Sequence, residues 1–381
     1  MLRTASLPLS NQEGVARQSR QPTESSASMI ELRSDTFTLP TPEMLTAIST
    51  ASFGNDGYGE DNTVIALERL AAETLGKEAA CLMPSGTMAN LASLLAHRRS
   101  DENVVLVGDR SDIYVYEGKG ALLCRGLVYE PVATQRDGTI RMADLQSALN
   151  RHALKSDSSV AAVCLENPHN LNGGVVLPQN YVKEIAEFVH ARGVPLHLDG
   201  ARIFNAAVAS GAEPAQLARH ADSVQFCLSK GLAAPVGSLA LGSAEFIERV
   251  RDIRGVLGGT MRQAGVIAAA GIVALEQMVD RLADDHACAR RLAEGLARMS
   301  GIEIDLNTVQ TNNVVFRVVD DRFTCESFIA SARERGINLC EFKFGRLRAV
   351  VHHGVTPGQI EEALTILSEM LSEGPLLGAL D

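Results

Sequence analysis

The sequence contains no uninterrupted apolar run near the roughly 20 residues that a membrane-spanning helix needs, so we expect no transmembrane segment and no membrane partner. Basic residues are outnumbered: 35 lysines and arginines against 46 aspartates and glutamates give a formal net charge of −11. That charge argues against nucleic acid as a partner. The seven cysteines are odd in number and form no CxxC pair, which favours reduced thiols in a cytoplasmic protein.

Several common binding motifs are also missing. No GxxxxGK followed by Ser or Thr occurs, and no GxGxxG follows a strand-like run, so the usual nucleotide-binding loops have no support. HExxH and paired Cys/His spacings are absent too. We therefore predict no metal site, and the adjacent His352 and His353 do not suggest one.

The chain of 381 residues is long enough for a large and a small domain. Residues 1–28 have no hydrophobic period and are rich in Ser, Gln and Arg, so we expect a disordered tail. A transit peptide would share the Arg and Ser content, but Glu13 and Glu24 argue against it. The predicted domains are residues 29–275 and 276–381.

Helical and strand-like segments alternate over residues 40–250. Apolar residues recur at helical spacing in 42–51, 63–76 and 87–98, and short β-rich apolar runs cover 79–86, 104–109, 160–167, 194–202 and 223–230. This alternation predicts a mainly parallel sheet with helices on both faces. Residues 262–301 predict a helix or helix pair that leaves the large domain, followed by a small α+β domain.

Polar residues occur where these apolar runs end, and the carboxyl ends of parallel strands are where active sites gather. The segment MPSGTMANL places Ser85, Gly86 and Thr87 at a helix start, where backbone N–H groups and hydroxyls suit a phosphate. An ordinary N-cap is the alternative. Asp199, in LHLDGAR, needs a partner once it is buried, and a cofactor pyridinium or Arg202 would serve.

Lys230, in FCLSKGLAAPVGS, lies between an apolar run and small residues rather than among polar neighbours. Burial or a nearby cation lowers the pKa of a lysine and makes the amine fit for Schiff-base chemistry. Pyridoxal 5′-phosphate (PLP) requires a phosphate anchor, a carboxylate for its ring nitrogen and an amine for its aldehyde. The three features together predict a PLP site.

Eight motifs carry a resemblance to a known family: LRSDTFTLPTPEM, GYGEDNTVIALE, MPSGTMANL, YVYEGKGA, LENPHNLNGGVVLP, LHLDGARIFNA, CLSKGLAAPVGS and LGGTMRQAG. Over residues 30–370 the chain resembles the PLP-dependent L-threonine aldolases of the β-eliminating lyase group, which have the aspartate aminotransferase-like fold (fold type I). The resemblance implies an α/β large domain with a mainly parallel seven-stranded sheet between helices, and a small C-terminal α+β domain.

The resemblance also implies roles for individual residues. Lys230 would bind the cofactor aldehyde, Asp199 the pyridinium nitrogen, and Ser85, Gly86 and Thr87 the phosphate. Ser34, Arg202 and Arg348 would bind the substrate carboxylate, with Arg202 also beside the cofactor. His169 would lie near the substrate hydroxyl as a candidate base. Arg262 would reach the cofactor site of a neighbouring subunit in a homotetramer built from close dimers.

One cofactor-site position departs from the family pattern. Asp112 stands where the family has a histidine that stacks on the cofactor ring, and an aspartate cannot stack. Lys119 is a candidate partner for its charge. Pro168 also stands where threonine is common. These changes leave the cofactor prediction in place but weaken the assignment of threonine as the substrate.

The reaction implied by the resemblance is retro-aldol cleavage of an L-β-hydroxy-α-amino acid to glycine and an aldehyde. The substrate would be threonine, allo-threonine or a larger analogue. A β-eliminating lyase, or an aldolase specialised for a larger hydroxy-amino acid in secondary metabolism, is the alternative. A catalytically silent protein that uses the same fold for binding is a third reading, and the presence of Lys230, Asp199 and Arg202 argues against it.

Overall fold

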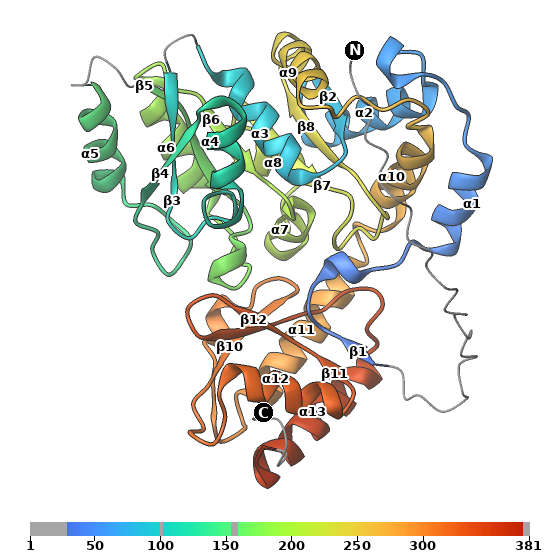
Figure 1. Cartoon of the computed structure of the whole chain (residues 1–381), viewed down its shortest axis with the longest axis vertical. Helices are drawn as coiled ribbons and strands as arrows, with labels where there is room; N and C mark the ends of the chain where they lie inside the picture. The colour runs from blue at the N-terminus through green and yellow to red at the C-terminus, as the bar shows by residue number, and fades with distance from the viewer. Residues whose placement is uncertain (1–28, 100–101, 154–158, 376–381) are drawn as a thin grey trace, which may run out of the picture.

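The computed structural model describes residues 29–99, 102–153 and 159–375. The predicted disordered tail, residues 1–28, lies outside the described residues. A sheet with helices on both faces forms the larger part of the molecule, and a smaller sheet with three helices lies beneath it (Figure 1). Among the described residues, no helix is long and apolar enough to cross a membrane.

The large domain contains a seven-stranded sheet. In sheet order the strands are β2 (Ala79–Met83), β8 (Ser238–Gly242), β7 (Ser223–Cys227), β6 (Leu196–Asp199), β5 (Ser159–Glu166), β3 (Glu102–Gly108) and β4 (Val128–Val132). Strand β8 is antiparallel to both of its neighbours, and all other pairs are parallel. Every residue of β6 and β7 is buried, as expected for strands covered on both faces.

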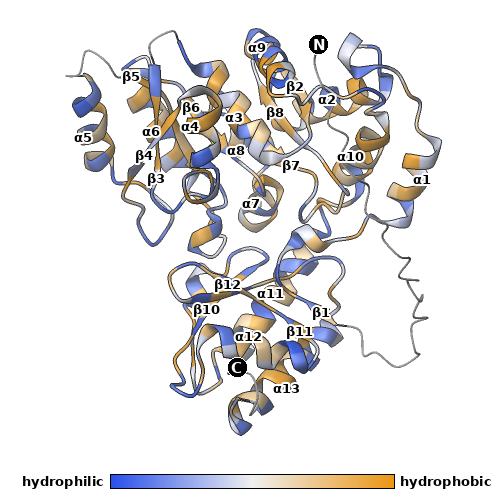
Figure 2. Ribbon diagram, in the orientation of Figure 1, coloured by the Kyte–Doolittle hydropathy of each residue, from blue (hydrophilic) through white to orange (hydrophobic). Residues whose placement is uncertain are grey.

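Side chains alternate between two cores, one on each face of the sheet. On one face of the sheet, Leu106 packs in a core with α2, α5 and α6. On the other face, Val105 and Val107 pack in a separate core with α3. The helices of the large domain are α1 (Pro42–Thr50), α2 (Asn62–Leu75), α3 (Gly86–His97), α4 (Gly118–Arg125), α5 (Met142–Ala153), α6 (Gln179–His190), α7 (Ile203–Ser210), α8 (Pro214–Ala218), α9 (Ala244–Val256) and α10 (Gly265–Gln277). Helix α10 is hydrophobic over most of its surface (Figure 2).

The small domain has an antiparallel sheet in the order β12 (Cys340–Phe342), β13 (Arg346–Val350), β10 (Asn313–Val318) and β9 (Ile302–Glu303). Helices α11 (Leu282–Leu296), α12 (Cys325–Glu334) and α13 (Pro357–Glu373) pack with it. The pair α10 and α11 is the helix pair predicted over 262–301.

The first described strand belongs by packing to the small domain. Strand β1 (Ile30–Glu31) pairs with β11 (Ile337–Asn338), and Ile30 and Leu32 are buried in the small-domain core. The chain therefore contributes residues 30–32 to the small domain before it builds the large one. The division at residues 275 and 276 stays a prediction.

Candidate active site

Two of the predicted residues lie together because two parallel strands end at one edge of the sheet. Asp199 is the last residue of β6 and pairs in register with Glu166, the last residue of β5. Lys230 follows β7 by three residues, and its charge lowers the pKa of both Asp199 and Asp35. The amine therefore lies near two buried carboxyl groups at the carboxyl edge of the sheet.

Asp199 is 3% exposed and is held by donors on three sides. Its Oδ1 accepts hydrogen bonds from the side chain of Gln225 and from the backbone of Ala201, and its Oδ2 accepts one from Asn90. Burial raises the pKa of Asp199, and the Lys230 ammonium opposes that effect. A buried carboxylate with a fixed set of donors is suited to hold a cation such as a protonated ring nitrogen.

Lys230 is half-buried in a turn that follows β7. Its carbonyl oxygen accepts hydrogen bonds from the Thr38 hydroxyl, at 3.2 Å, and from the Ala233 backbone N–H, at 2.9 Å. Ala233 has φ of 64°, a left-handed conformation that is uncommon for a residue with a Cβ. These contacts fix the backbone from which the Lys230 amine extends.

The predicted phosphate site is the N-terminus of α3. Ser85 is the N-cap, and its Oγ accepts a hydrogen bond from Met88 N. Gly86 lies close to β7, because a Cβ at this position would come 2.8 Å from Cys227 Sγ. The Thr87 hydroxyl hydrogen-bonds to Glu117. The helix thus presents its first N–H groups beside the end of β7, where a phosphate would be bound by hydrogen bonds and by the helix dipole.

Glu117 was not predicted as a site residue. It ends a π-helical turn (Ile113–Glu117), and burial raises its pKa to about 7, with a further contribution from the nearby Asp199 charge. The motif YVYEGKGA contains this residue, but nothing in its spacing predicts contact with Thr87 and Asn90.

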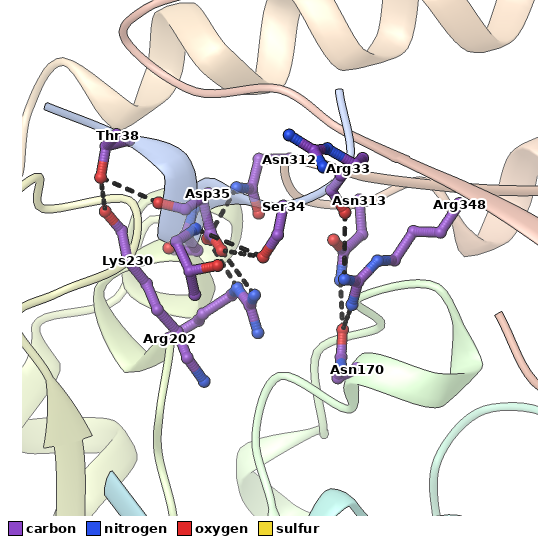
Figure 3. A network of polar contacts seen from close by, with 12 residues as sticks. Arg33, Ser34, Asp35, Thr38, Asn170, Arg202, Lys230, Asn312, Asn313 and Arg348 are labelled. Atoms are coloured by element: carbon purple, nitrogen blue, oxygen red, sulfur yellow. Dashed lines mark hydrogen bonds and ion pairs between the residues drawn. The ribbon is translucent and has the colours of Figure 1, made fainter. Parts of the chain in front are cut away.

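Arg202 forms a buried ion pair that sequence analysis missed. Its Nε and Nη2 lie 2.7 and 2.6 Å from the two carboxylate oxygens of Asp35, which is fully buried (Figure 3). Burial raises the pKa of Asp35, but Arg202, with smaller contributions from Lys230 and Asn312, holds that pKa well below its usual range. Asn312 of the small domain also donates to Asp35. Ser34, the N-cap of the turn that carries Asp35, is adjacent to the pair.

A second polar cluster centres on Asn170 (Figure 3). Its Oδ1 accepts from Arg348, at 3.2 Å, and from Asn313, at 2.9 Å, and both donors belong to the small domain. Its Nδ2 donates to Asp112, at 2.9 and 3.0 Å. Asn170 therefore links the departing residue Asp112 to the predicted carboxylate-binding Arg348. The partner of Asp112 is Asn170 rather than the candidate Lys119, which is exposed.

Glu166 fixes the backbone on both sides of this cluster. Its carboxyl oxygens accept the backbone N–H groups of Asp112, at 2.8 Å, and Asn170, at 2.7 Å. Burial raises the pKa of Glu166 well above its usual value, and the nearby Asp112 charge raises it further. Glu166 thus orients both residues without facing solvent itself.

His169 is buried, with 1% exposure, and neither ring nitrogen has a hydrogen-bond partner within the described chain. Burial lowers its pKa to about 4. The ring is therefore uncharged at neutral pH and keeps an acceptor nitrogen. Arg262, in contrast, is exposed and lies beside Gly57, where a Cβ would come 3.2 Å from its Nη1. The structure does not bring Arg262 to the Lys230 site of its own chain.

Comparisons with known proteins agree with this arrangement. The model of the β-eliminating lyase family matches residues 31–320. Low-specificity L-threonine aldolase 1 of Arabidopsis thaliana is 40% identical, covering 90% of this chain and 96% of that protein. The low specificity L-threonine aldolase of Escherichia coli K12 is also 40% identical, with 88% and 97% covered.

Solved structures confirm the predicted fold class. The threonine aldolase of Leishmania major has a TM-score of 0.76 at 18% identity, covering 90% of this chain and 99% of that one. At that level of identity the likeness concerns the fold alone, whereas the sequence relatives establish the family. The chain therefore belongs to the β-eliminating lyase family, in the group that contains the low-specificity L-threonine aldolases.

Proposed function

We propose that the protein is a PLP-dependent aldolase that cleaves an L-β-hydroxy-α-amino acid to glycine and an aldehyde. One observation carries the proposal: Lys230 and Asp199 lie near each other at the carboxyl edge of the sheet, beside the N-terminus of α3. The relatives named as L-threonine aldolases support the same reaction.

The residues present fit the cofactor. Asp199 is a buried carboxylate beside a lysine, and the three donors on its oxygens favour the ionised form that a pyridinium requires. Gly86 packs so closely against Cys227 that there is no room for a Cβ at the start of α3. Ser85, Gly86 and Thr87 would hold the phosphate, Asp199 the ring nitrogen and Lys230 the aldehyde carbon. When bound, the cofactor supplies an electron sink for the Cα–Cβ bond cleavage.

The chain's own residues would hold the amino acid and handle its protons. Arg348, held by Asn170 and by the carbonyl of Arg33, presents a fixed guanidinium for the carboxylate. Arg202 and Ser34 would complete this subsite, with Asp35 orienting Arg202. His169 would accept the proton of the substrate hydroxyl, directly or through a water, because its ring is uncharged at neutral pH.

Asp112 supports keeping the alternative, a β-eliminating lyase or an aldolase for a larger hydroxy-amino acid. The carboxylate lies at the position expected for a stacking histidine and is tied to Asn170, so the substrate side of the site differs from the family pattern. Replacing Asp112→His is expected to raise activity on threonine relative to larger analogues. Asp112→Asn, which can still accept from Asn170, is the matched control.

We further propose a cytoplasmic homotetramer. All seven cysteines are free, which suits a reducing compartment. Exposed apolar side chains also occur near Arg262 in sequence or in space, including Phe53 (56%), Tyr58 (78%) and Val256 (64%). Association of copies over this face would cover them and would bring Arg262 to a neighbouring site.

Product analysis tests the proposal. Purified protein loaded with PLP is incubated with L-threonine, L-allo-threonine and longer β-hydroxy-α-amino acids, and glycine, aldehyde, keto acid and ammonia are measured together. Equal amounts of glycine and aldehyde are expected. Keto acid and ammonia without glycine would establish a β-eliminating lyase, and glycine from the longer substrates alone would establish an aldolase for a larger hydroxy-amino acid. No product from any substrate would refute the proposal and both alternatives.

A further inference from the structure

A line of hydrogen bonds crosses the large domain and ends at Asp199. His97 Nε2 lies 2.6 Å from Ser223 Oγ, which lies 2.7 Å from His197 Nδ1. His197 Nε2 lies 3.0 Å from Asn90 Oδ1, and Asn90 Nδ2 lies 3.1 Å from Asp199 Oδ2. We refer to His97, Ser223, His197 and Asn90 as the donor chain.

Regular secondary structure builds the donor chain. His197 and Asp199 are two residues apart in β6, so both side chains lie on the same face of the sheet. Ser223 pairs in register with His197 on the neighbouring strand β7. Helix α3 supplies both Asn90 and His97, seven residues and about two turns apart.

The middle of the donor chain is deeply buried. His197 and Ser223 are 0% exposed, and Asn90 is 2% exposed. The surrounding side chains on this face form apolar cores that include Ala92, Leu94 and Ala240. Polar groups at such depth are stabilising only when each is satisfied, and here each one is bonded to the next.

The direction of every bond follows from the ionised carboxylate at one end. Asp199 can only accept, so Asn90 turns its NH₂ toward it and its oxygen toward His197. That oxygen can only accept, so His197 carries its proton on Nε2. Burial lowers the pKa of His197 to about 3, so the ring is neutral and Nδ1 accepts from Ser223.

His97 completes the series at the other end. The Ser223 hydroxyl has already donated its proton to His197, so its oxygen accepts from His97 Nε2. Burial lowers the pKa of His97 to about 4, so this ring is also neutral near pH 7. His97 packs on Phe246, with ring centroids 4.5 Å apart, and lines a surface cavity with Arg249 and Asp222. All four donors therefore point from the surface toward Asp199.

We propose that the donor chain acts through Asn90 to hold Asp199 ionised and so keeps the cofactor ring nitrogen protonated. Ser223, His197 and His97 are positioning residues, since they are linked to Asp199 only through Asn90. The inference rests on the proposed function, because it concerns the partner of the ring nitrogen. It extends that function to side chains that do not contact Asp199 and that had no predicted role: His97, His197 and Ser223.

Other charged groups also act on Asp199, and the donor chain works against several of them. Burial and the Asp112 carboxylate raise its pKa, whereas Lys230 and the Gln225 amide lower it. The carboxyl groups of Glu117 and Glu166 and the thiol of Cys164 lie in the same electrostatic environment. Asn90 Nδ2 is also 3.4 Å from Glu117 Oε2, so its orientation decides which carboxyl group receives the stronger bond.

Substitution of Ser223 provides the test, because it breaks the middle link. Ser223→Ala removes the hydroxyl, Ser223→Thr keeps it, and Ser93→Ala removes a buried hydroxyl of α3 that bonds to nothing in the described chain. Each protein is loaded with PLP, and the pH midpoint of the visible absorbance change of the cofactor is measured.

Ser223→Ala is expected to shift that midpoint upward by about 0.5 pH unit or more, because a less firmly protonated ring leaves less positive charge beside the Lys230 nitrogen. Ser223→Thr and Ser93→Ala are expected to titrate like the unaltered protein. If Ser223→Ala does not fold, His97→Phe keeps the packing on Phe246 and is expected to shift the midpoint in the same direction by less.

An unchanged midpoint in a folded Ser223→Ala or His97→Phe protein would overturn the inference while leaving the proposed function standing. An equal shift in Ser93→Ala would also overturn it, since the effect would then be one of packing. Failure of the unaltered protein to bind PLP would instead refute the proposed function and the inference with it.

Discussion

Asp35 and Arg202 form the most deeply buried ion pair of the site, with side-chain exposures of 0% and 5%. Removing one partner of such a pair leaves an uncompensated charge in the interior, which is strongly destabilising. Asp35 is also bonded to Asn312 of the small domain, so its loss affects both domains.

Asp35→Asn should therefore lower the free energy of unfolding by about 3 kcal/mol. Urea denaturation of the cofactor-free protein measures this change. Glu294→Gln, which breaks the exposed Arg290–Glu294 pair, is the control and should leave the midpoint unchanged. An Asp35→Asn protein as stable as the control would contradict the importance of the buried pair.

Glu117 gives a pH-dependent prediction. Its pKa is raised by burial from 4.5 to about 7 in the folded protein, so its contribution to stability is present below pH 4.5 and is lost as the pH rises through 7. Glutamine does not ionise, so Glu117→Gln removes the loss of stability that ionisation of the buried carboxyl group causes at high pH. The variant should match the unaltered protein at pH 4.5 and exceed it by about 1–3 kcal/mol at pH 8.

Urea midpoints of the cofactor-free proteins at the two pH values measure this difference. Glu184→Gln, at an exposed position of α6, is the matched control and should change neither value. A Glu117→Gln protein that is less stable at pH 8 would show that the carboxyl group is ionised and favourably bonded there.

At the residue scale, sequence reasoning found the side chains that end apolar runs and missed those defined by tertiary contact. Asp199 and Lys230 could be predicted because the carboxyl ends of parallel strands meet at one edge. Asp35 and Asn170 could not, although both lie within quoted motifs, because their partners are 167 and 178 residues away in sequence. His97, by the same logic, reads as an ordinary residue near a helix end.

At the scale of elements, α3 carries two tasks. Its first residues form the predicted phosphate site, and its body supplies Asn90 and His97 to the donor chain. Both tasks depend on how closely the helix start approaches β7, and Gly86 sets that distance against Cys227. A shift of α3 would disturb both.

Gly86→Ala is therefore expected to weaken PLP binding by about tenfold, because the new methyl group must move Cys227 or the helix. The dissociation constant, measured by absorbance titration, gives the effect. Adding Cys227→Ala removes the atom that the methyl group meets and should restore most of the affinity, and Cys227→Ala alone is the control. Equal losses in Gly86→Ala and in the double variant would contradict the steric explanation.

The elements themselves were largely predictable, with two exceptions in the sheet. The short apolar runs predicted β2, β3, β5, β6 and β7 within a few residues, because their length and β-rich composition both indicated strands. Strand β4 contains Pro131 and lies at the edge, and three of the five residues of β8 are small, so neither has a strong pattern. Strand β4 is defined by its pairing with β3, and β8 by its pairing with β2 and β7.

At the scale of the whole molecule, the two domains meet through polar side chains of the site. Asp35 joins Arg202 to Asn312, and Asn170 joins the large domain to Asn313 and Arg348 (Figure 3). The substrate subsite is therefore completed only where the domains contact each other. The sequence predicted the helix pair α10 and α11 but not the pairing of β1 with the small domain. The contact between the two domains could not be predicted, because it depends on the assembled fold.

Arg348→Lys tests that contact. Lysine keeps the charge but cannot bond Asn170 and the Arg33 carbonyl together as the guanidinium does. We expect the KM for threonine to rise about tenfold, with a smaller change in kcat. Arg317→Lys, at an exposed position of β10, is the control and should leave both constants unchanged. An unaltered KM in Arg348→Lys would remove Arg348 from the substrate subsite.

The proposed function depends first on Lys230 as the residue that binds the cofactor. Reduction of the PLP-loaded protein with borohydride, followed by digestion and mass spectrometry of the peptides, tests it most directly. We expect one modified peptide, with the reduced cofactor attached to Lys230, and no modification in Lys230→Ala. Attachment at another lysine, or no attachment in a protein that binds PLP, would contradict it.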